Sequence, residues 1–562
     1  MALRIANPCG VHRARWGKSR VPAGLLILSC MTSRHRTKDV QWESLFALQD
    51  KPAMPLQQRL RMVAVEAILE GRLPPGATLP SSRELAKTLG LSRNTVTSAY
   101  MRLIDDGFLE AHPRSGVFVK VHGDPRPSGL NKADWRAKPL AEPARTPQSQ
   151  PEREAPGMAQ PTSPDWSARL IRSLSDRRTL AKPDQWRQYP YPFVYGTFDP
   201  QLFPTEAFRE CCVHSLARVH LPQWTPDFEL SDVPELIEQI RLRLLPKRGV
   251  FALPEEILIT VGAQHAYYML GEALFDAQSR VGLEEPGHPH ARNSFASRQP
   301  QWQPLAVDDQ GLVVDHLPSL DYVYVTPSHQ SPTTRTLSLE RRKRLLALAE
   351  QRDFVVIEDD YEAENLYVGE PMPALKSLDK VGRVIYVGSI SKSLSPSLRL
   401  GYIVAPRALI AELRVLRHAM VRHPSAFLQH AFAHFLSLGH HEPHARRVNQ
   451  ALQARMQAVG EALRRELPDF QFELPTGGAS VWVRAPDWVD TAELALMARE
   501  QGVLIEAGEV FFMHPPYPCP YFRLRLSSIG LEQISPGIRA LAVAMHALAQ
   551  ARGVPRVLAR WH

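Results

Sequence analysis

The 562-residue sequence predicts a large α/β domain that follows a small, mainly helical domain, with a long linker between them. Beyond about residue 189, apolar strand-like runs alternate with helical patterns over several hundred residues, which is typical of an α/β sheet protein. Near the front, two short helical patterns with capping residues are separated by a glycine. Between the two regions lies a stretch rich in Pro, Ala, Ser and charged residues.

Composition and charge are those of an ordinary globular protein with room for a large core. Hydrophobic residues make up 44% and charged residues 22% of the chain, and its length favours more than one domain. The formal charge of +9, from 67 basic and 58 acidic residues, suits an anionic partner. The five cysteines form no metal-type or redox pair. We therefore expect reduced thiols, a cytoplasmic protein and no metal site.

The first 30 residues contain a stretch that resembles an export signal. VPAGLLILSC follows several arginines and ends at Cys30, but its apolar core is shorter than the roughly 7–15 residues of a signal peptide. We expect residues 1–51 to form a disordered extension, with Met31 as an alternative start site. No run approaches the ~18 consecutive apolar residues of a membrane-spanning helix.

Two capped helices are predicted in the front domain, which we place at residues 52–122. Ser81 and Glu84 form a capping box for the first helix, and Gly90 ends it. Ser92 can cap a second helix. Its buried side is predicted to comprise Val96, Ala99, Tyr100, Leu103 and Ile104. Two short helices around a glycine-containing turn are the helix-turn-helix arrangement, and FLEAHPRSGVFVK predicts two further strands around a basic turn, a wing.

The second helix exposes donors at its start. Arg93, Asn94, Thr95 and Thr97 are predicted to point outward. Short or forked donors near a helix N-terminus are what a major-groove reader presents to phosphates and base edges. The alternative is a small helical domain with a solvated polar face, because helix-turn-helix lookalikes are common.

Nearly the whole front domain resembles the winged-helix module of the GntR family of bacterial repressors. The resemblance is carried by G-x-L-x-P-G-x-x-L-P-S-x-R-x-L-A and by S-R-N-T-V. It implies that Arg83, Arg93 and Thr95 contact DNA and that the wing tip at Gly116 enters the minor groove. With Asn94, these residues form the predicted DNA-binding set, and the expected partner is promoter DNA.

The stretch after the front domain predicts an extended, flexible linker over residues 123–188. It begins GDPRPSGLNKADWRAK and buries too few apolar groups to offset its ordering entropy. The large effector domain is predicted to follow at residues 189–555.

A serine-rich segment of the large domain contains a single lysine. In YVGSISKSLSPSLRLGY, Lys392 is the only lysine among five serines. An amine forms an imine with an aldehyde only when it is unprotonated. The ordinary lysine pKa of about 10.4 must therefore be lowered, or the aldehyde must be bound tightly. A phosphorylated aldehyde supplies tight binding through its phosphate, and Ser389, Ser391 and Arg399 are suitable donors near Lys392.

A second anion site is predicted where a strand passes through Gly262 into a helix. The amides of Ala263 and Gln264 would lie at the positive N-terminus of that helix. The acidic residues that end FVVIEDDY lie where open α/β sheets bind ligands, and an aspartate there can keep a pyridine nitrogen protonated. Taken singly, the serine-rich loop and the acidic run also fit ordinary solvated segments.

Together these segments resemble the fold-type I class of pyridoxal phosphate (PLP) enzymes, the aspartate aminotransferase-like group. The specific motif is S-x-S-K-S-L-x-P-x-x-R-x-G. The family order is also followed by GTFDPQLFP, ITVGAQHA, EEPGH, TPSHQSPT, IEDDYEAE and YFRLRLSS. A GntR-type domain, a long linker and this fold in one chain are similar to the MocR family of transcriptional regulators. The expected fold is thus α/β, with an N-terminal winged helix-turn-helix joined by a long linker to a fold-type I, PLP-dependent aminotransferase-like domain.

The resemblance implies PLP as the cofactor and a role for each site residue. Lys392 would form the internal aldimine, Asp359 would pair with the pyridine nitrogen, and Tyr361 would contact the ring hydroxyl. His288 would stack on the ring, and Arg523 would bind the α-carboxylate of an amino-acid ligand. The phosphate would be held by Ser389, Ser391, Arg399, Ala263 and Gln264.

Some positions depart from the family pattern. The choice of Asp359 over Glu358 or Asp360 depends on the alignment with the family, and a shift of one residue would change it. Aminotransferases carry an Asn-Pro-Thr-Gly turn where this chain has Ser-Pro-Thr-Thr at residues 331–334, and TPDFELSDVPELIEQIRLRL lacks the tyrosine that reaches a neighbouring subunit's phosphate. His288 replaces the usual aromatic residue, and Arg525 competes with Arg523 for a carboxylate. Lost ring contacts should reduce turnover before imine formation, which favours a sensor over an enzyme.

The sequence therefore predicts a PLP-dependent, DNA-binding transcriptional regulator that senses an amino compound or PLP through an aldimine on Lys392. Two alternatives stay open: an active aminotransferase with an attached DNA-binding module, and a regulator whose large domain only dimerises. Fold-type I proteins build their sites between two subunits, so the resemblance also implies a head-to-tail homodimer, with no membrane partner.

Overall fold

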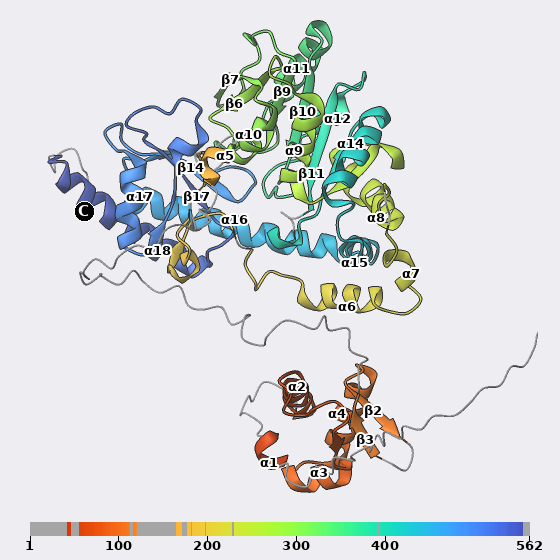
Figure 1. The fold of residues 1–562 in the computed structure, drawn as a ribbon. Helices are drawn as coiled ribbons and strands as arrows, with labels where there is room; N and C mark the ends of the chain where they lie inside the picture. The colour runs from red at the N-terminus through yellow and green to blue at the C-terminus, as the bar shows by residue number, and fades with distance from the viewer. Residues whose placement is uncertain are drawn as a thin grey trace, which may run out of the picture. The chain divides into compact units, whose positions relative to one another are not determined.

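The computed structural model divides the chain into two compact units, residues 1–160 and residues 161–562 (Figure 1). The part of the chain that the structure describes comprises residues 42–46, 56–112, 116–120, 165–170, 177–180, 182–196, 198–227, 230–362, 364–390 and 394–554. No helix within these ranges is both long enough and apolar enough to cross a membrane.

The first unit contains the predicted helix-turn-helix and wing. Its helices are α1 (Trp42–Leu45), α2 (Leu56–Leu69), α3 (Ser82–Leu89) and α4 (Arg93–Asp105). Its strands β1 (Thr78–Leu79), β2 (Leu109–His112) and β3 (Gly116–Val119) form an antiparallel sheet in the order β1-β3-β2. The strand β1 is an addition to the two predicted wing strands.

Local capping signals set the bounds of α3 and α4 as predicted. The Ser81 hydroxyl accepts from the Glu84 N–H at 3.2 Å, and the Ser92 hydroxyl accepts from the Thr95 N–H at 3.1 Å. Gly90 ends α3 in the left-handed conformation with φ of 64°. Of the predicted buried face of α4, all positions are buried except Ile104, which is half-buried.

The core of the first unit includes a residue that the sequence analysis placed outside it. Phe46 is only 1% exposed and packs with residues of α2, α3 and α4. Residues 42–46 were predicted to belong to a disordered extension, but they form α1 and contribute to this core. A single aromatic side chain can supply enough apolar area to attach a short segment that carries no helix signal of its own. The remainder of the predicted extension lies outside the described residues.

An eight-stranded sheet with the order β5-β12-β11-β10-β9-β6-β7-β8 forms the centre of the second unit. Strands β7, β6, β9, β10 and β11 are parallel, whereas β8, β12 and β5 each pair with their neighbour in antiparallel fashion. The strands are β5 (Ile257–Thr260), β6 (Arg280–Glu285), β7 (Gln301–Asp308), β8 (Gly311–Leu312), β9 (Tyr322–Val325), β10 (Val355–Asp360), β11 (Val384–Ser389) and β12 (Gly401–Val404).

Helices cover both faces of this sheet (Figure 1). One face packs against α9 (Gly262–Leu274), α10 (Pro289–Phe295) and α14 (Arg407–Val421). The other packs against α8 (Pro234–Gln239), α11 (Leu339–Arg352), α12 (Leu375–Leu378) and α15 (Ala426–Ser437). Successive side chains of a strand alternate between faces, so Ile357 of β10 packs toward α9 whereas Val356 packs toward α11.

A second, smaller sheet lies near the C-terminal end, in the order β13-β14-β17-β16. Its strands are β13 (Gln471–Phe472), β14 (Ser480–Arg484), β16 (Glu506–Ala507) and β17 (Tyr521–Arg525). The helices α16 (His441–Glu466), α17 (Thr491–Glu500) and α18 (Leu531–Ala551) pack against it. Figure 1 shows α16 running from the region of α15 toward α18, so this one helix joins the two parts of the unit.

The C-terminal part of the predicted linker packs on the second unit. Arg177 donates to the carbonyl oxygen of Asn293 at 2.6 Å, and the Asn293 side chain donates to the Arg178 carbonyl at 2.8 Å. A two-residue strand β4 (Tyr191–Pro192) then pairs with β15 (Val503–Leu504). Residues 177–180 and 182–188 therefore belong with the large domain rather than with a free linker, because Arg177, Arg178 and Lys182 are hydrogen-bonded to it. Two short helices follow, α6 (Thr205–Ser215) and α7 (Leu221–Trp224).

The packing of Phe46 predicts that Phe46→Ala weakens the first unit. Removing a buried phenylalanine typically costs about 3 kcal/mol, which corresponds to roughly a hundredfold faster exchange of protected amides. Hydrogen-exchange mass spectrometry on the full chain should show this acceleration in α2 to α4. Leu69→Ala is the matched control, because Leu69 of α2 is 73% exposed and its loss should leave exchange unchanged. Equal exchange in both variants would mean that α1 does not stabilise the unit.

Candidate functional site

A cavity of about 350 Å³ in the second unit brings together side chains from several elements. Of the residues predicted from sequence, it is lined by Ala263, Gln264, His288, Tyr361, Ser389, Arg399 and Arg523. The other lining residues are Leu180, Lys182, Tyr195, Tyr267, His290, Ser331 and Arg525. These positions span almost 350 residues of sequence, so the fold creates the site by joining both sheets and the segment before β4.

One end of the cavity is formed by the first turn of α9. Gly262 begins this helix with φ of 71°, and a Cβ there would lie 3.0 Å from the Arg399 guanidinium. A side chain at this position would therefore be strained and would displace Arg399. The helix N-terminus points the amides of Ala263 and Gln264 at this end, beside the hydroxyl of Ser389 and the cation of Arg399. Such an arrangement favours an anion of the size of a phosphate.

The strand β10 carries three consecutive acids, and only the middle one lies on the α9 face. Asp359 is 2% exposed, and its Oδ2 accepts from the Tyr267 hydroxyl at 2.5 Å and from the Tyr324 hydroxyl at 2.6 Å. Burial raises the pKa of both phenols well above 10, so they stay protonated and donate. Asp359 does not line the cavity itself, but Tyr267 does.

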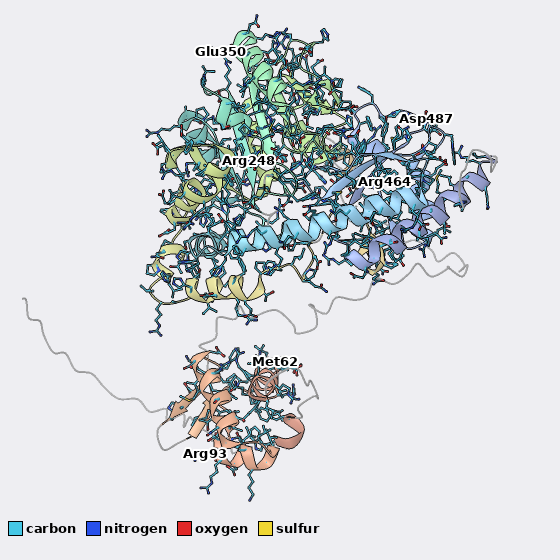
Figure 2. All side chains as sticks on the ribbon, turned by 180° about the vertical axis from the view of Figure 1, so that it is seen from behind. Met62, Arg93, Arg248, Glu350, Arg464 and Asp487 are labelled. Carbon is cyan, nitrogen blue, oxygen red and sulfur yellow. The ribbon has the colours of Figure 1, made fainter. Side chains whose placement is uncertain are left out.

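The neighbouring acids point to the opposite face. Asp360 pairs with Arg248 at 2.7 Å and accepts from the Tyr386 hydroxyl at 2.9 Å. Glu358 accepts from two backbone amides at the start of α12. Figure 2 shows Arg248 inside the large unit. The alternation of side chains along β10 thus supports the choice of Asp359 as the acid directed toward α9 and away from these structural pairs.

Two arginines from β17 enter the cavity with carboxylate partners already in place. Arg523 lies opposite Glu506 of β16 in the sheet register, and its Nε donates to Glu506 Oε2 at 2.7 Å. Arg525, two residues further along the same face, forms an ion pair with Glu362. Both arginines that are candidates for binding a ligand carboxylate therefore line the cavity, and each is paired with a buried glutamate.

Both predicted ring-contact residues, His288 and Tyr361, line the cavity. His288 is the N-cap of α10, where its Nδ1 accepts from the Ala291 N–H at 3.1 Å, so the ring direction is fixed. Its ring centroid lies 6.3 Å from that of Tyr361. Tyr361 is 8% exposed, and burial raises the pKa of its hydroxyl. Ser331 lines the cavity in the turn where aminotransferases carry asparagine.

Lys182 is a cavity residue that the sequence analysis did not identify. Its Nζ donates to the Tyr195 carbonyl oxygen and lies 4.6 Å from the centre of the Trp186 ring. Burial lowers the pKa of this amine. Lys182 falls in the region predicted to be linker, where no local pattern signals a binding residue. Tyr267, by contrast, is four residues after Ala263 on α9, so helical spacing alone places both on one face.

The predicted cofactor residues Ser391 and Lys392 lie outside the described residues. Ser389 ends β11 and lines the cavity, and Ile390 is the last described residue before this segment. It resumes at Leu394, which is buried in the core beneath β11 and β12.

In the first unit, most of the predicted DNA-contact residues are exposed. Arg83 of α3 and Arg93 and Asn94 at the start of α4 are exposed. Arg93 points away from the body of this unit in Figure 2. Thr95 is half-buried, and its hydroxyl lies 2.8 Å from that of Ser92, so part of its bonding capacity serves the helix cap. Gly116 is exposed and begins β3 with φ of 112°.

Comparisons with known proteins match both units. Residues 57–119 match the family described as bacterial regulatory proteins, gntR family, and residues 231–540 match aminotransferase class I and II. The transcriptional regulator TauR of Rhodobacter capsulatus is 40% identical over 87% of this chain and 96% of its own. The probable rhizopine catabolism regulatory protein MocR of Rhizobium meliloti is 30% identical over 89% of this chain and 96% of its own. The chain belongs to the MocR family of GntR-type transcriptional regulators.

Solved structures similar to the large domain of this MocR-family regulator include aminotransferases. Kynurenine aminotransferase of Pyrococcus horikoshii, in a complex with PMP, has a TM-score of 0.62 and 27% identity and covers 68% of this chain and 96% of its own. LysN of Thermus thermophilus, complexed with N-(5'-phosphopyridoxyl)-L-leucine, has a TM-score of 0.63 and 27% identity over 69% of this chain and 99% of its own. The MocR-family chain thus combines a GntR-type DNA-binding domain with the aminotransferase fold.

A buried acid behind the cavity predicts a specific pH dependence of stability. Glu284 of β6 is 3% exposed and accepts from the Thr326 N–H and hydroxyl at 3.1 and 2.6 Å, and desolvation raises its pKa from 4.5 to about 7. The folded state therefore holds a proton that the unfolded state releases. The stability that this proton contributes is complete below about pH 4.5 and is lost as the pH rises through about 7.

Glu284→Gln should remove this loss, because the amide cannot ionise. Between pH 6 and 8.5 the unfolding free energy of the large domain should fall by roughly 1.4 kcal/mol more in the wild type than in the variant. Denaturant titrations at several pH values measure the difference. Glu412→Gln, at an exposed position of α14, should keep the wild-type profile. Parallel profiles for wild type and Glu284→Gln would contradict the assignment.

Proposed function

We propose that this regulator binds promoter DNA through its winged helix and senses a small amino compound, or PLP itself, in the cavity of its large domain. PLP would be the cofactor, held through Lys392. The cavity is the observation that supports this proposal most strongly. It is lined by the anion-binding start of α9, by the tyrosines Tyr195, Tyr267 and Tyr361, and by two arginines of β17. Two features support PLP as the cofactor: the start of α9 favours a phosphate, and Tyr267 of the cavity is hydrogen-bonded to the buried acid Asp359.

Different residues of the chain would bind different parts of this cofactor. Ala263, Gln264, Ser389 and Arg399 would bind the phosphate through amides, a hydroxyl and a cation. Asp359 would hold a proton on the pyridine nitrogen, and its two phenolic donors orient its carboxylate. Tyr361 and His288 would contact the ring. When bound, PLP supplies an aldehyde for amines and an electron-withdrawing ring.

A ligand carboxylate would be bound by Arg523 or Arg525. Because each guanidinium already pairs with a buried glutamate, the ligand would share or replace Glu506 or Glu362. Such an exchange moves a side chain of β16 or of the loop after β10. A ligand that favours one arrangement of these pairs over another can shift the population of domain arrangements, which is what an allosteric sensor requires.

The same cavity leaves an aminotransferase activity as the second candidate. Ser331 stands where the enzymes carry an asparagine, and the relatives with the same two domains are named as transcriptional regulators, which supports sensing over turnover. A steady-state assay with amino donors and a keto acceptor separates the two. Sustained turnover near the enzyme median of about 10 per second would replace the sensor proposal.

A homodimer with head-to-tail pairing completes the proposal. Two winged helices would read two half-sites, and the long segment between the units would leave the half-site spacing variable. Light scattering on the full chain measures the oligomeric state directly. A monomer that binds its operator with full affinity would remove this part of the proposal.

Lys392→Ala should abolish covalent attachment of PLP. The wild-type protein incubated with PLP should show visible absorbance of the bound cofactor, and borohydride reduction followed by peptide mass spectrometry should place it at Lys392. The variant should show neither. Lys343→Ala, at an exposed lysine of α11, is the matched control and should keep both signals. Cofactor retained in Lys392→Ala but lost in Lys343→Ala would overturn the assignment.

Arg93→Ala should weaken binding to the protein's own upstream DNA without changing the cofactor spectrum. Loss of one arginine contact to a base or phosphate costs about 1–3 kcal/mol, so we expect roughly tenfold to hundredfold weaker binding at constant salt. Fluorescence anisotropy with labelled promoter DNA measures this. Arg102→Ala is the control on the same helix, since Arg102 is exposed near the other end of α4. A variant that also lost the spectrum would show that the two units do not act separately.

A further inference from the structure

Histidines from three separate segments meet on the second unit, and none of them lines the cavity described above. His214 lies in the last turn of α6, His220 precedes α7, and His430 and His434 are one turn apart on α15. The ring centroid of His214 lies 4.1 Å from that of His434 and 4.3 Å from that of His220. Because more than 200 residues separate α6 from α15 in sequence, only the fold brings these rings together.

Three of the rings can each direct one nitrogen at a common point. The candidate ligand atoms of His214, His220 and His434 all lie within 4.8 Å of one another. His214 Nδ1 and His434 Nε2 are 3.1 Å apart. Two nitrogens bound to one tetrahedral zinc ion at about 2.0–2.1 Å are separated by about 3.3–3.4 Å, so this pair is already close to the required spacing. The third nitrogen, from His220, lies within 4.8 Å of the other two.

A glutamine fixes the ring of His220 in the orientation that a ligand needs. His220 Nδ1 lies 3.0 Å from Gln223 Oε1, an oxygen that can only accept. The proton of His220 therefore lies on Nδ1, and the lone pair of Nε2 is available for an ion. Carbonyl oxygens commonly orient the histidine ligands of metal ions in this way.

His430 supports the same glutamine and does not compete for the ion. Its Nε2 lies 2.7 Å from Gln223 Oε1, and its Nδ1 lies 3.0 Å from the Ser215 hydroxyl. Both ring nitrogens are therefore already bonded. His430 is buried, and its bonds connect α15 to the end of α6 and hold Gln223 in place.

The surroundings suit an ion that arrives from solvent. His214 is exposed, whereas His220 and His434 are half-buried, so an ion can reach the three rings and still keep a water ligand. Neutral imidazole is the form of histidine that binds a metal ion. The group holds no carboxylate, which disfavours Mg²⁺ and Ca²⁺ and favours late transition metals.

We propose that His214, His220 and His434 form a binding site for a divalent transition-metal ion such as Zn²⁺, with water as the fourth ligand. Gln223 and His430 are positioning residues. A bound ion would join α6, the start of α7 and α15, and would thereby stabilise this helical corner of the second unit. The ion would occupy a place separate from the cofactor cavity, so the proposal stands or falls independently of PLP binding.

Competition between full-length protein and a coloured zinc chelator tests the site. Protein freed of metal should bind one zinc ion per chain through these rings. His214→Gln and His434→Gln should each weaken zinc binding at least tenfold, and Gln223→Ala should weaken it by up to tenfold through loss of ring orientation. His546→Gln is the matched control, because His546 is an exposed histidine on α18 and should bind zinc like the wild type. Equal affinity in wild type, His214→Gln and His434→Gln would place the ion elsewhere and overturn the proposal.

Two further readouts separate metal binding from a loss of folding. Zn²⁺ should raise the unfolding temperature of the wild type and of His546→Gln but not that of His434→Gln. Co²⁺ bound by three imidazoles and one water should give the strong visible absorbance of a four-coordinate ion, and His214→Gln should lose it. Since His214 is exposed, its replacement leaves the core intact, and a folded His214→Gln that keeps the cobalt spectrum would also overturn the proposal.

Discussion

The carboxylate of Asp359 and the two phenols that donate to it form the interaction on which the large domain's site depends. An ionised carboxylate is costly to bury unless donors compensate for lost water, and Tyr267 and Tyr324 provide them from α9 and β9. These bonds hold α9 against the centre of the sheet. The same helix supplies the amides of Ala263 and Gln264, so α9 alone sets the distance between the Asp359 carboxylate and the anion-binding residues of the cavity.

The sequence was sufficient where the determining signals are local. Ser81, Gly90 and Ser92 fix the bounds of α3 and α4 through contacts a few residues away, and the site motifs follow in the order of the family. The sequence was not sufficient to predict features that depend on residues far apart in the chain. The burial of Phe46 and the position of Lys182 beside Tyr195 depend on tertiary contacts of segments with no pattern of their own. The alternation of side chains along β10 places Asp359 on the opposite face of the sheet from Glu358 and Asp360. Only the packing of α9 and α12 shows that the Asp359 side chain faces α9 and the Glu358 side chain faces α12.

The buried ion pairs of β17 bear on how strongly any ligand can bind. Arg523 is already paired with Glu506, so an anionic ligand that binds Arg523 must share or replace this pairing. The net binding free energy is therefore the difference between two similar ion pairs. That difference is small compared with the attraction of a bare cation. A sensor must release its ligand when the ligand concentration falls, and a small net binding free energy permits this release. In the absence of ligand, the pair with Glu506 spares buried Arg523 the free-energy cost of an unpaired charge.

The segment just before and after β4 contributes both to the cavity and to the packing of the large domain. Lys182 and Tyr195 line the cavity, and the preceding Arg177 and Arg178 are hydrogen-bonded to Asn293 of α10. A ligand that contacts Lys182 or Tyr195 would therefore add to the interactions that hold this segment against the domain. Occupancy of the cavity would then change the local unfolding free energy of the segment, even if the two sheets kept their positions.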